Sequence, residues 1–486
     1  MFIFQIQVSP PALKLTPEAV RQLLDPENRY DPEIMLRIAE VVVEAGGISK
    51  KKLAVLRTAL DDIAKAAGKY ARKAFEALAN KDIGRLFVKK PEKVAEAFAK
   101  IVEAIGEDAK WAFHVLKSKA VGELFAKNPQ AFVEIAEAVG KDAWKVFDEL
   151  ENETVGRLFE RNPEGFVEIV KAVVEHRAEV TFRMLENPDI ARVFVEKPEE
   201  TVKAIVDIAN AAGRDTDLAF KALGCKVISK LFAEDPKKVA EAFKRIVEVA
   251  WVDTPWAFQA LMARKEDKLD FFTRLDDGLC NRLKEEFNID FIMRYPGGVL
   301  EDMLSGRRDP ARPLAIIAYP KYDHNRAFYL NKIWQLYRAG FQVVVFESGN
   351  EGEFMEWAER IVAKWGPADV VVLGGHGEPQ KIRLGAGESE ENFLDVTDNN
   401  VLEALKPLVG PGGVFVLDSC STGDPKTTDN IARLISERTG TIVFAPDRPT
   451  AISNFNIQYD ENGRPVLVSV EYSGPTEQVY EKGERQ

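Results

Sequence analysis

Two stretches in the last third of the chain decide its fold class: VVVLGGHG at residues 370–377 and GVFVLDSCSTG at residues 413–423. Each opens with consecutive apolar residues, which is typical of a strand buried on both faces, and each closes on glycine and small polar residues. Amphipathic helical patterns separate these stretches from further apolar runs at 314–319, 341–346 and 441–445. This alternation predicts a three-layer α/β domain with a mainly parallel sheet.

The helices predicted for this domain fill the spaces between its strands. Their apolar residues recur at spacings of three and four, so one face of each helix can pack on the sheet. A last apolar run at 465–471 is predicted as an edge strand of the same sheet. The helices are expected at residues 326–339, 354–365, 401–408 and 428–437.

His376 and Cys420 each follow the C-terminal end of a predicted strand. One crossover links the two strands, and because such connections are right-handed we expect the strands to be neighbours in one sheet. Ligands bind at the C-terminal rim of open α/β sheets, so an imidazole and a thiol would meet there. A neighbouring imidazole activates a cysteine by stabilising its nucleophilic thiolate form. The alternative is that Cys420 is a buried core cysteine and His376 an ordinary loop histidine.

No motif for a cofactor or a metal ion is present. The chain lacks a Gly-x-x-x-x-Gly-Lys-Ser/Thr phosphate loop, and residues 374–377 are too short for a dinucleotide fingerprint. No two histidines have the spacing of metal ligands. The three cysteines, Cys225, Cys280 and Cys420, are too scattered for a disulfide framework or a zinc site. We therefore expect neither a cofactor nor a metal ion.

The two motifs, whose His376 and Cys420 stand 44 residues apart (420 minus 376), resemble those of the caspase-like cysteine peptidases of clan CD. The element DSCSTG (418–423) is similar to the metacaspase pattern Asp-Ser-Cys-x-x-Gly, and the site is most similar to metacaspase and clostripain-type motifs. The Gln-Ala-Cys motif of caspases is absent. The resemblance covers about residues 313–471 and implies a caspase-like fold with cysteine-type endopeptidase activity.

The resemblance also implies roles for individual residues. Cys420 would be the nucleophile and His376 the general acid and base, with the backbone amides of Gly377 and Cys420 as oxyanion donors. Asp418 matches the acid that lines the pocket for a basic P1 side chain, the substrate residue before the cleaved bond. Asp447 matches, by position only, a second pocket acid of clostripain-like enzymes. The implied substrates are proteins or peptides cleaved after Arg or Lys.

Two neighbouring positions leave alternatives open. The loop after the first strand, KYDHN at residues 321–325, reaches the same rim, so Asp323 is either a substrate contact or part of a plain polar loop. Arg448 stands beside Asp447 and would neutralise it. Asp418 itself either lines the P1 pocket or caps the turn that follows it.

The first half of the chain is a tandem repeat. A Leu-Phe or Val-Phe pair stands four residues before a proline five times, and these prolines are spaced 38, 34, 35 and 38 residues apart. Each proline is predicted to begin a helix, where its missing N–H costs nothing. One such unit cannot bury its apolar face alone, so stacked units are expected to form an α-solenoid. The prolines are Pro91, Pro129, Pro163, Pro198 and Pro236, and the predicted N-caps before them are Asn128, Asn162 and Asp235.

The sequence therefore predicts four segments. Residues 1–82 hold an N-terminal segment and a degenerate helical repeat, 83–265 the tandem repeats, 266–312 a cap and connector, and 313–486 the caspase-like peptidase domain. The helical array either binds a protein partner or has a purely structural role. A second hypothesis for the whole chain is a helical-repeat scaffold whose caspase-like domain binds partners with weak or no proteolysis.

Composition and charge restrict the partners and the location. Lys and Arg number 66 against 78 Asp and Glu, and the net charge of −12 argues against nucleic acid or an anionic membrane as the main partner. No apolar run approaches the roughly 18 residues of a membrane helix. The opening MFIFQIQVSPP lacks the basic region and the cleavage site of a secretory signal. We therefore expect a cytoplasmic protein.

Overall fold

The computed structural model of the protein describes residues 15–46, 49–173, 178–264, 266–323, 328, 332–474 and 477–486. The chain divides into two compact units, Met1–Thr273 and Arg274–Gln486. The boundary falls inside residues 266–312, the segment predicted to be a separate cap and connector. Most of this segment belongs to the second unit because its helix α23 (Gly297–Ser305) packs against strand β2 (Gln342–Ser348).

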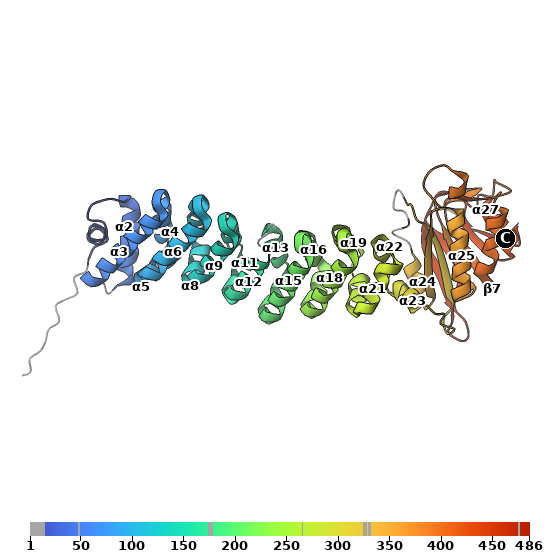
Figure 1. Cartoon of the computed structure of the whole chain (residues 1–486), viewed down its shortest axis with the longest axis horizontal. Coiled ribbons are helices and arrows are strands. Elements are labelled where there is room, and N and C mark those ends of the chain that lie inside the picture. Colours follow the sequence, from blue (N-terminus) through green and yellow to red (C-terminus); the bar gives the residue numbers. More distant parts are fainter. Residues whose placement is uncertain are drawn as a thin grey trace, which may run out of the picture. The chain divides into compact units, whose positions relative to one another are not determined.

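The first unit is a succession of helix triplets, in which one longer helix precedes two short ones (Figure 1). All five repeat prolines begin a helix, as their positions predict. The helices are α1 (Pro17–Leu24), α2 (Pro32–Ala45), α3 (Lys50–Ala67), α4 (Ala71–Leu78), α5 (Lys81–Lys89), α6 (Pro91–Ile105), α7 (Ala109–Leu116), α8 (Lys119–Lys127), α9 (Pro129–Val139), α10 (Ala143–Glu149), α11 (Glu153–Arg161), α12 (Pro163–Val173), α13 (Ala178–Leu185), α14 (Pro188–Glu196), α15 (Pro198–Ala212), α16 (Thr216–Leu223), α17 (Lys226–Glu234), α18 (Pro236–Ala250), α19 (Thr254–Arg264) and α20 (Glu266–Arg274).

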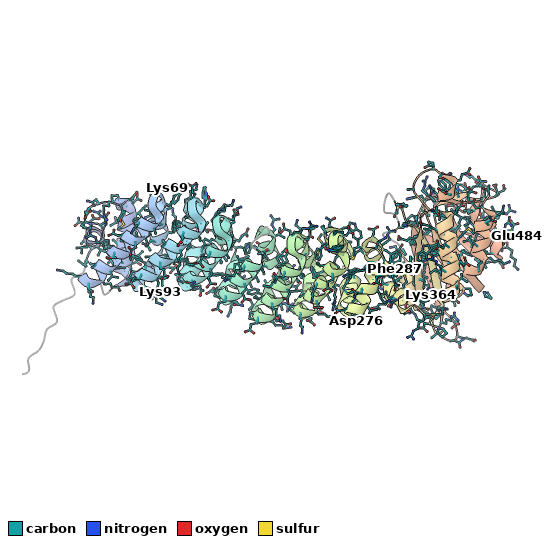
Figure 2. All side chains as sticks on the ribbon, in the orientation of Figure 1. Lys69, Lys93, Asp276, Phe287, Lys364 and Glu484 are labelled. Carbon is teal, nitrogen blue, oxygen red and sulfur yellow. The ribbon has the colours of Figure 1, made fainter. Side chains whose placement is uncertain are left out.

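Corresponding helices of successive triplets pack on one another. Helix α6 packs on α9, α9 on α12, α12 on α15 and α15 on α18, and the short helices follow the same order. The unit is therefore a stacked helical array, in which each triplet buries its apolar face against the next. Charged side chains such as those of Lys69 and Lys93 lie at opposite edges of the array (Figure 2).

Phenylalanine rings form a continuous ladder through the core of this array. The Phe of each Leu-Phe pair alternates with a Phe of the following long helix, and the rings meet edge to face. Their centroids are 5.3–5.6 Å apart, and every ring is buried. The repeat signature is thus the core itself. The ladder runs through Phe98, Phe125, Phe132, Phe159 and Phe166.

Asparagine and aspartate side chains cap several helices of the array, and one cap that was not predicted also links two repeats. Asn128 makes no side-chain cap, whereas Asn162 and Asp235 accept backbone N–H groups as predicted. Asn80 is a cap that the repeat pattern did not predict: its Oδ1 caps α5, while its Nδ2 donates to the Ser118 carbonyl of the next repeat at 2.9 Å. Asn80 therefore satisfies two helix ends at once.

The second unit contains a mainly parallel sheet. Within the described residues it has seven strands in the order β12-β11-β8-β7-β3-β1-β2, and only β11 and β12 run antiparallel to their neighbours. The strands are β1 (Leu314–Pro320), β2, β3 (Ala368–Gly374), β7 (Val409–Asp418), β8 (Ile442–Pro446), β11 (Glu477–Glu481) and β12 (Glu484–Arg485).

Two layers cover this sheet. The buried cluster on one face joins the strands to helices α25 (Glu351–Trp365), α26 (Asn399–Leu405) and α27 (Ile431–Thr439), as Figure 1 shows for α25 and α27. The other face packs against α23, α24 (Ile333–Ala339) and a hairpin of β9 (Ile452–Tyr459) and β10 (Pro465–Tyr472). Helices α21 (Asp277–Glu286) and α22 (Ile289–Arg294) precede α23.

The prediction of an edge strand at 465–471 is wrong. Within the described residues this run forms β10, which pairs only with β9 in a separate two-stranded sheet, and beyond β8 the main sheet continues through β11 to the edge strand β12. The residues of β10 alternate between buried and exposed, which suits a strand buried on one face and not one inside a doubly covered sheet. A third small sheet combines β4 (Gly377–Glu378), β5 (Lys381–Arg383) and β6 (Phe393–Asp395).

No helix in the described part of the chain is both long enough and apolar enough to cross a membrane.

The phenylalanine ladder predicts a large stability loss when one ring is removed. Phe132 contacts the rings of Phe125, Phe147 and Phe159 and is fully buried, so Phe132→Ala should lower the free energy of unfolding of the array by about 3–5 kcal/mol. Urea unfolding followed by far-UV circular dichroism measures it. Trp111→Ala, at a residue 47% exposed, is the control and should change this free energy far less. An equal effect of both substitutions would contradict the ladder.

Candidate active site

Strands β3 and β7 bring the two sequence motifs to one place. They are parallel neighbours, as predicted, and their register pairs Leu373 with Leu417 and Gly374 with Asp418. Both strands therefore end at the same level of the rim, and the residues that follow them start side by side. The Gly375 N–H donates to the Asp418 carbonyl at 3.3 Å and continues the pairing into the loop.

Glycine at position 377 allows the loop to close onto the cysteine. A Cβ atom at Gly377 would lie 2.7 Å from the Cys420 carbonyl oxygen and 3.1 Å from its nitrogen. The first distance is shorter than a Cβ atom tolerates and the second is unusually tight, so any side chain here would push the loops apart. The residue after His376 thus packs directly against the backbone of Cys420.

Cys420 stands at the tip of a strained turn. The side chain is only partly buried, and its Sγ atom lies 3.6 Å from the Thr450 carbonyl oxygen. Ser421 adopts a φ of +58°, a conformation that few non-glycine residues take and that is often found at functional sites. In the described part of the chain the backbone N–H of Cys420 donates to no acceptor. Cys420 is therefore not a core cysteine.

His376 is held by groups from the loop after β1. Its Nε2 atom lies 3.5 Å from Oδ1 of Asp323, a carboxylate that is completely buried. The other oxygen of Asp323 accepts the Phe328 N–H at 2.8 Å, and the Phe328 ring stands edge-on to the imidazole at 5.6 Å. Asp323 therefore lies beside the imidazole, close enough to form an ion pair whenever the histidine carries a proton.

The strand order explains why Asp323 lies next to His376, although the sequence around Asp323 is also typical of an ordinary polar loop. Strand β1 pairs with β3 on the side away from β7, so the loop after β1 must reach the loop that carries His376. A carboxylate three residues beyond β1 is thus a candidate partner for the imidazole. The neighbouring His324 and the residues 325–327 lie outside the described part of the chain.

Asp418 and Cys420 both contact the segment that leads into β9, since Asp418 receives the Ile452 N–H and the Cys420 Sγ atom lies 3.6 Å from the Thr450 carbonyl oxygen. Asp418 is only 8% exposed. Its carboxylate accepts a hydrogen bond from the Tyr319 hydroxyl at 2.9 Å and another from the Ile452 N–H. Burial raises the pKa of Asp418 above its usual value, and these two hydrogen bonds oppose that shift. Burial and the nearby Asp418 charge raise the pKa of the Tyr319 hydroxyl as well.

Asp447 is paired with its neighbour. Following β8, it receives Nε and Nη2 of Arg448 at 3.0 and 3.1 Å, while Arg448 stays 61% exposed. The hydrogen bond to Asp447 raises the pKa of Arg448. The neutralisation that the sequence suggested is therefore present.

The backbone N–H groups of Gly377 and Cys420 are the predicted oxyanion donors, and the structure restricts where the first of them points. The Arg383 N–H bonds the His376 carbonyl at 2.8 Å, so Gly377 belongs to the next, non-bonded pair of the β4–β5 ladder and its N–H points away from β5. The Cys420 amide is also available. The two residues are also in close backbone contact, since a Cβ atom at Gly377 would lie 3.1 Å from the Cys420 nitrogen.

The other cysteines and the one other histidine that the structure describes lie in elements outside this site. Cys280 is buried in α21, and Cys225 is partly exposed before α17, where its Sγ atom contacts the Lys221 carbonyl. His114 lies on the surface of α7, and His176 lies outside the described residues. Where the chain is described, no group of three or more His, Cys, Asp or Glu residues is arranged to hold a metal ion.

Comparison with known families finds no family model that matches the chain, and no curated protein matches it with significant similarity.

The buried Asp418 carboxyl predicts a pH-dependent stability. Because its pKa is raised in the folded protein, this group stabilises the fold below its unfolded pKa of about 3.9, and the contribution is lost as pH rises through the folded value. Asp418→Asn cannot ionise, so the free energy of unfolding of the variant minus that of the wild type should increase from pH 4 towards neutrality. Urea titrations at several pH values measure this difference. A difference that is flat or falls with pH would show that Asp418 is not desolvated.

Proposed function

We propose that the second unit is a caspase-like cysteine endopeptidase in which Cys420 and His376 form the catalytic dyad. One observation carries the proposal: the Gly-His-Gly loop after β3 packs against the Cys420 backbone after β7, and the buried Asp323 lies beside the imidazole. A structural cysteine and an ordinary loop histidine would need neither the strained turn at Ser421 nor a buried carboxylate at the imidazole.

The reaction follows from these positions. His376 takes the proton of Cys420, and the thiolate attacks the carbonyl carbon of the scissile bond. The oxyanion receives the N–H groups of Gly377 and Cys420. His376 then donates its proton to the leaving amine, the C–N bond breaks and a thioester forms. A water molecule, deprotonated by His376, hydrolyses the thioester and restores the thiol.

Asp323 has a positioning role in this proposal. Its contact with Nε2 holds the imidazole so that Nδ1 remains for proton exchange with Cys420 and the substrate. Its negative charge also stabilises the imidazolium that forms when Cys420 loses its proton.

We further propose that the enzyme cleaves after Arg or Lys. Among the described residues, the hydrogen-bond donors to Asp418 are neutral, the Tyr319 hydroxyl and the Ile452 amide, and burial raises the pKa of its carboxyl. A guanidinium or ammonium group from the substrate would supply the missing positive charge. Asp447 contributes less, because Arg448 already binds both of its oxygens.

The alternative hypothesis is a helical-repeat scaffold with weak or no proteolysis, and the first experiment must distinguish it from an active peptidase. Cys420→Ala and His376→Ala should each reduce hydrolysis of fluorogenic Arg peptides by about 10³-fold or more, because the dyad acts as a unit. Iodoacetamide should label Cys420 in the wild type and much more slowly in His376→Ala. Cys225→Ala, at a residue outside the site, is the matched control and should keep full activity. Slow labelling that does not depend on His376, with no hydrolysis, would support the scaffold.

Specificity tests the role of Asp418 separately. Asp418→Asn keeps the size of the side chain but removes its charge, so the transition state for cleavage after Arg should lose about 2–4 kcal/mol of binding. A peptide library that varies P1 measures kcat/KM for the variant and the wild type. Asp447→Asn should have the smaller effect. Efficient wild-type cleavage after Asp, or an unchanged Arg preference in Asp418→Asn, would contradict the basic P1 pocket and leave the dyad intact.

A further inference from the structure

Strand β2 is an edge of the main sheet, and part of its backbone is unpaired. In the described sheet only β1 pairs with it. The Gln342 N–H bonds the Pro313 carbonyl and the Lys321 N–H bonds the Ser348 carbonyl, both at 2.8 Å. The even-numbered residues of β2 therefore direct their backbone groups to β1, and the odd-numbered residues direct theirs outwards.

The outward groups differ along the strand. The Val343 N–H is covered by α23, since it donates to Oδ2 of Asp302 at 3.1 Å. The N–H and carbonyl groups of Val345 and Glu347 have no partner among the described residues. An edge with unpaired groups is a template for another extended segment.

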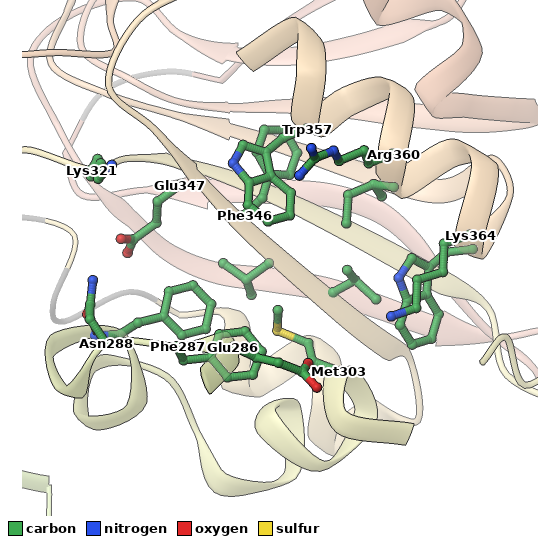
Figure 3. A pocket seen from close by; sticks show the side chains of 15 residues that line it. Glu286, Phe287, Asn288, Met303, Lys321, Phe346, Glu347, Trp357, Arg360 and Lys364 are labelled. Carbon is green, nitrogen blue, oxygen red and sulfur yellow. The ribbon is translucent and has the colours of Figure 1, made fainter. Parts of the chain in front are cut away.

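These unpaired groups face a cavity of about 550 Å³ that lies entirely within the second unit. Four consecutive residues of β2, 344–347, line it, so the cavity contacts side chains from both faces of the strand and follows its edge. Figure 3 shows β2 crossing the cavity between two walls. The volume is in the range of sites that bind small ligands or short peptides.

The two walls differ in chemistry. The wall from α21 to α23 is mainly apolar and includes Phe287, Phe291 and Met303. The α25 wall combines Trp357, which is 40% exposed, with the cations Arg360 and Lys364. Side chains of an extended peptide alternate between two directions, so an alternating apolar and charged sequence matches these walls.

The charges of the cavity favour an acidic peptide. Its two acids are occupied, because Glu286 binds Arg282 at 2.8 Å and Glu347 is held by the buried Arg294. Arg360 binds Glu356 of its own helix. Lys364 lies at the opposite end of the cavity from Glu347 (Figure 3) and has no carboxylate within 4.0 Å in the described part of the chain. A carboxylate of the bound segment would supply the counter-charge at this end.

We propose that this cavity binds an extended peptide in which apolar residues alternate with acidic ones, by adding it as a strand to β2. The bound segment exchanges hydrogen bonds with Val345 and Glu347, directs its apolar side chains to Phe287 and Phe291, and directs an acidic one to Lys364. The cavity contains none of the residues of the Cys420 site, and two strands, β1 and β3, separate β2 from β7. Binding here is therefore independent of the proposed peptidase activity.

The test uses the full chain with Cys420→Ala, so that no peptide is cleaved whether or not the protein is an enzyme. The probe is a fluorescein-labelled octapeptide in which Glu alternates with Val and Phe, and fluorescence anisotropy measures its binding. Two control peptides isolate the interactions: one carries N-methyl groups on alternate residues and cannot pair with an edge, and one replaces every Glu with Lys.

We expect saturable binding of the acidic peptide and at least tenfold weaker binding of both control peptides. Lys364→Glu should weaken binding of the acidic peptide by about tenfold, whereas Lys406→Glu, an exposed charge outside the cavity, should leave it unchanged. Val345→Pro should also weaken it by removing an outward N–H, and the N-methyl peptide gives the same information if this variant does not fold.

Three results would overturn the proposal. They are the absence of saturable binding, equal binding of the N-methylated peptide, and unchanged binding in Lys364→Glu. Sedimentation of the peptide-free protein tests a different occupant. A dimer that Lys364→Glu dissociates and that excludes the probe would mean that a second copy of the chain, and not a peptide, covers the edge.

Discussion

The parallel pairing of β3 with β7 is the constraint on which the rest of the second unit depends. It sets Gly374 opposite Asp418, so that the two loops with chemical groups leave the sheet at one level. A shift of one residue would turn Asp418 to the opposite face of the sheet, away from Tyr319 and Ile452. The site is therefore created by a register that long apolar strands hold in place, and the loops need only turn sharply at their ends.

The parts of this structure that repeat or alternate were predictable from the sequence, because their energy comes from burial. The prolines and phenylalanines of the array mark real helix starts and a real core, since a proline fits the first turn and a large ring must be buried. The neighbouring strands of the second unit follow from continuous apolar runs and right-handed crossovers. The prediction that residues 465–471 form an edge strand of the main sheet was wrong, because an apolar run alone does not indicate which sheet a strand joins.

The remaining features depend on pairs of distant residues, which no local pattern shows. Tyr319 and Asp418 are 99 residues apart, and the hydroxyl reaches the carboxylate only because β1, β3 and β7 are adjacent. The same holds for Asp323 and His376, whose encounter needs the order of three strands and not the spacing of a motif. Asn80 is comparable in the array, since its bond to Ser118 joins two repeats. In each case the sequence shows a residue type that can form the contact, but it does not show which distant residue is its partner.

The two edges of the main sheet are protected in different ways, and the difference limits what β2 can bind. At one end the short, charged strand β12 closes the sheet, and a strand of two residues offers little for pairing. At the other end Asp302 covers Val343, and Arg312 holds that carboxylate through both of its oxygens. Among the residues that the structure describes, the stretch from Val345 to Glu347 is the part of this edge that stays open, between walls that approach from both faces. An opening this short cannot support the extended sheet-to-sheet pairing that leads to aggregation, but it is long enough for one extended segment whose side chains match the walls.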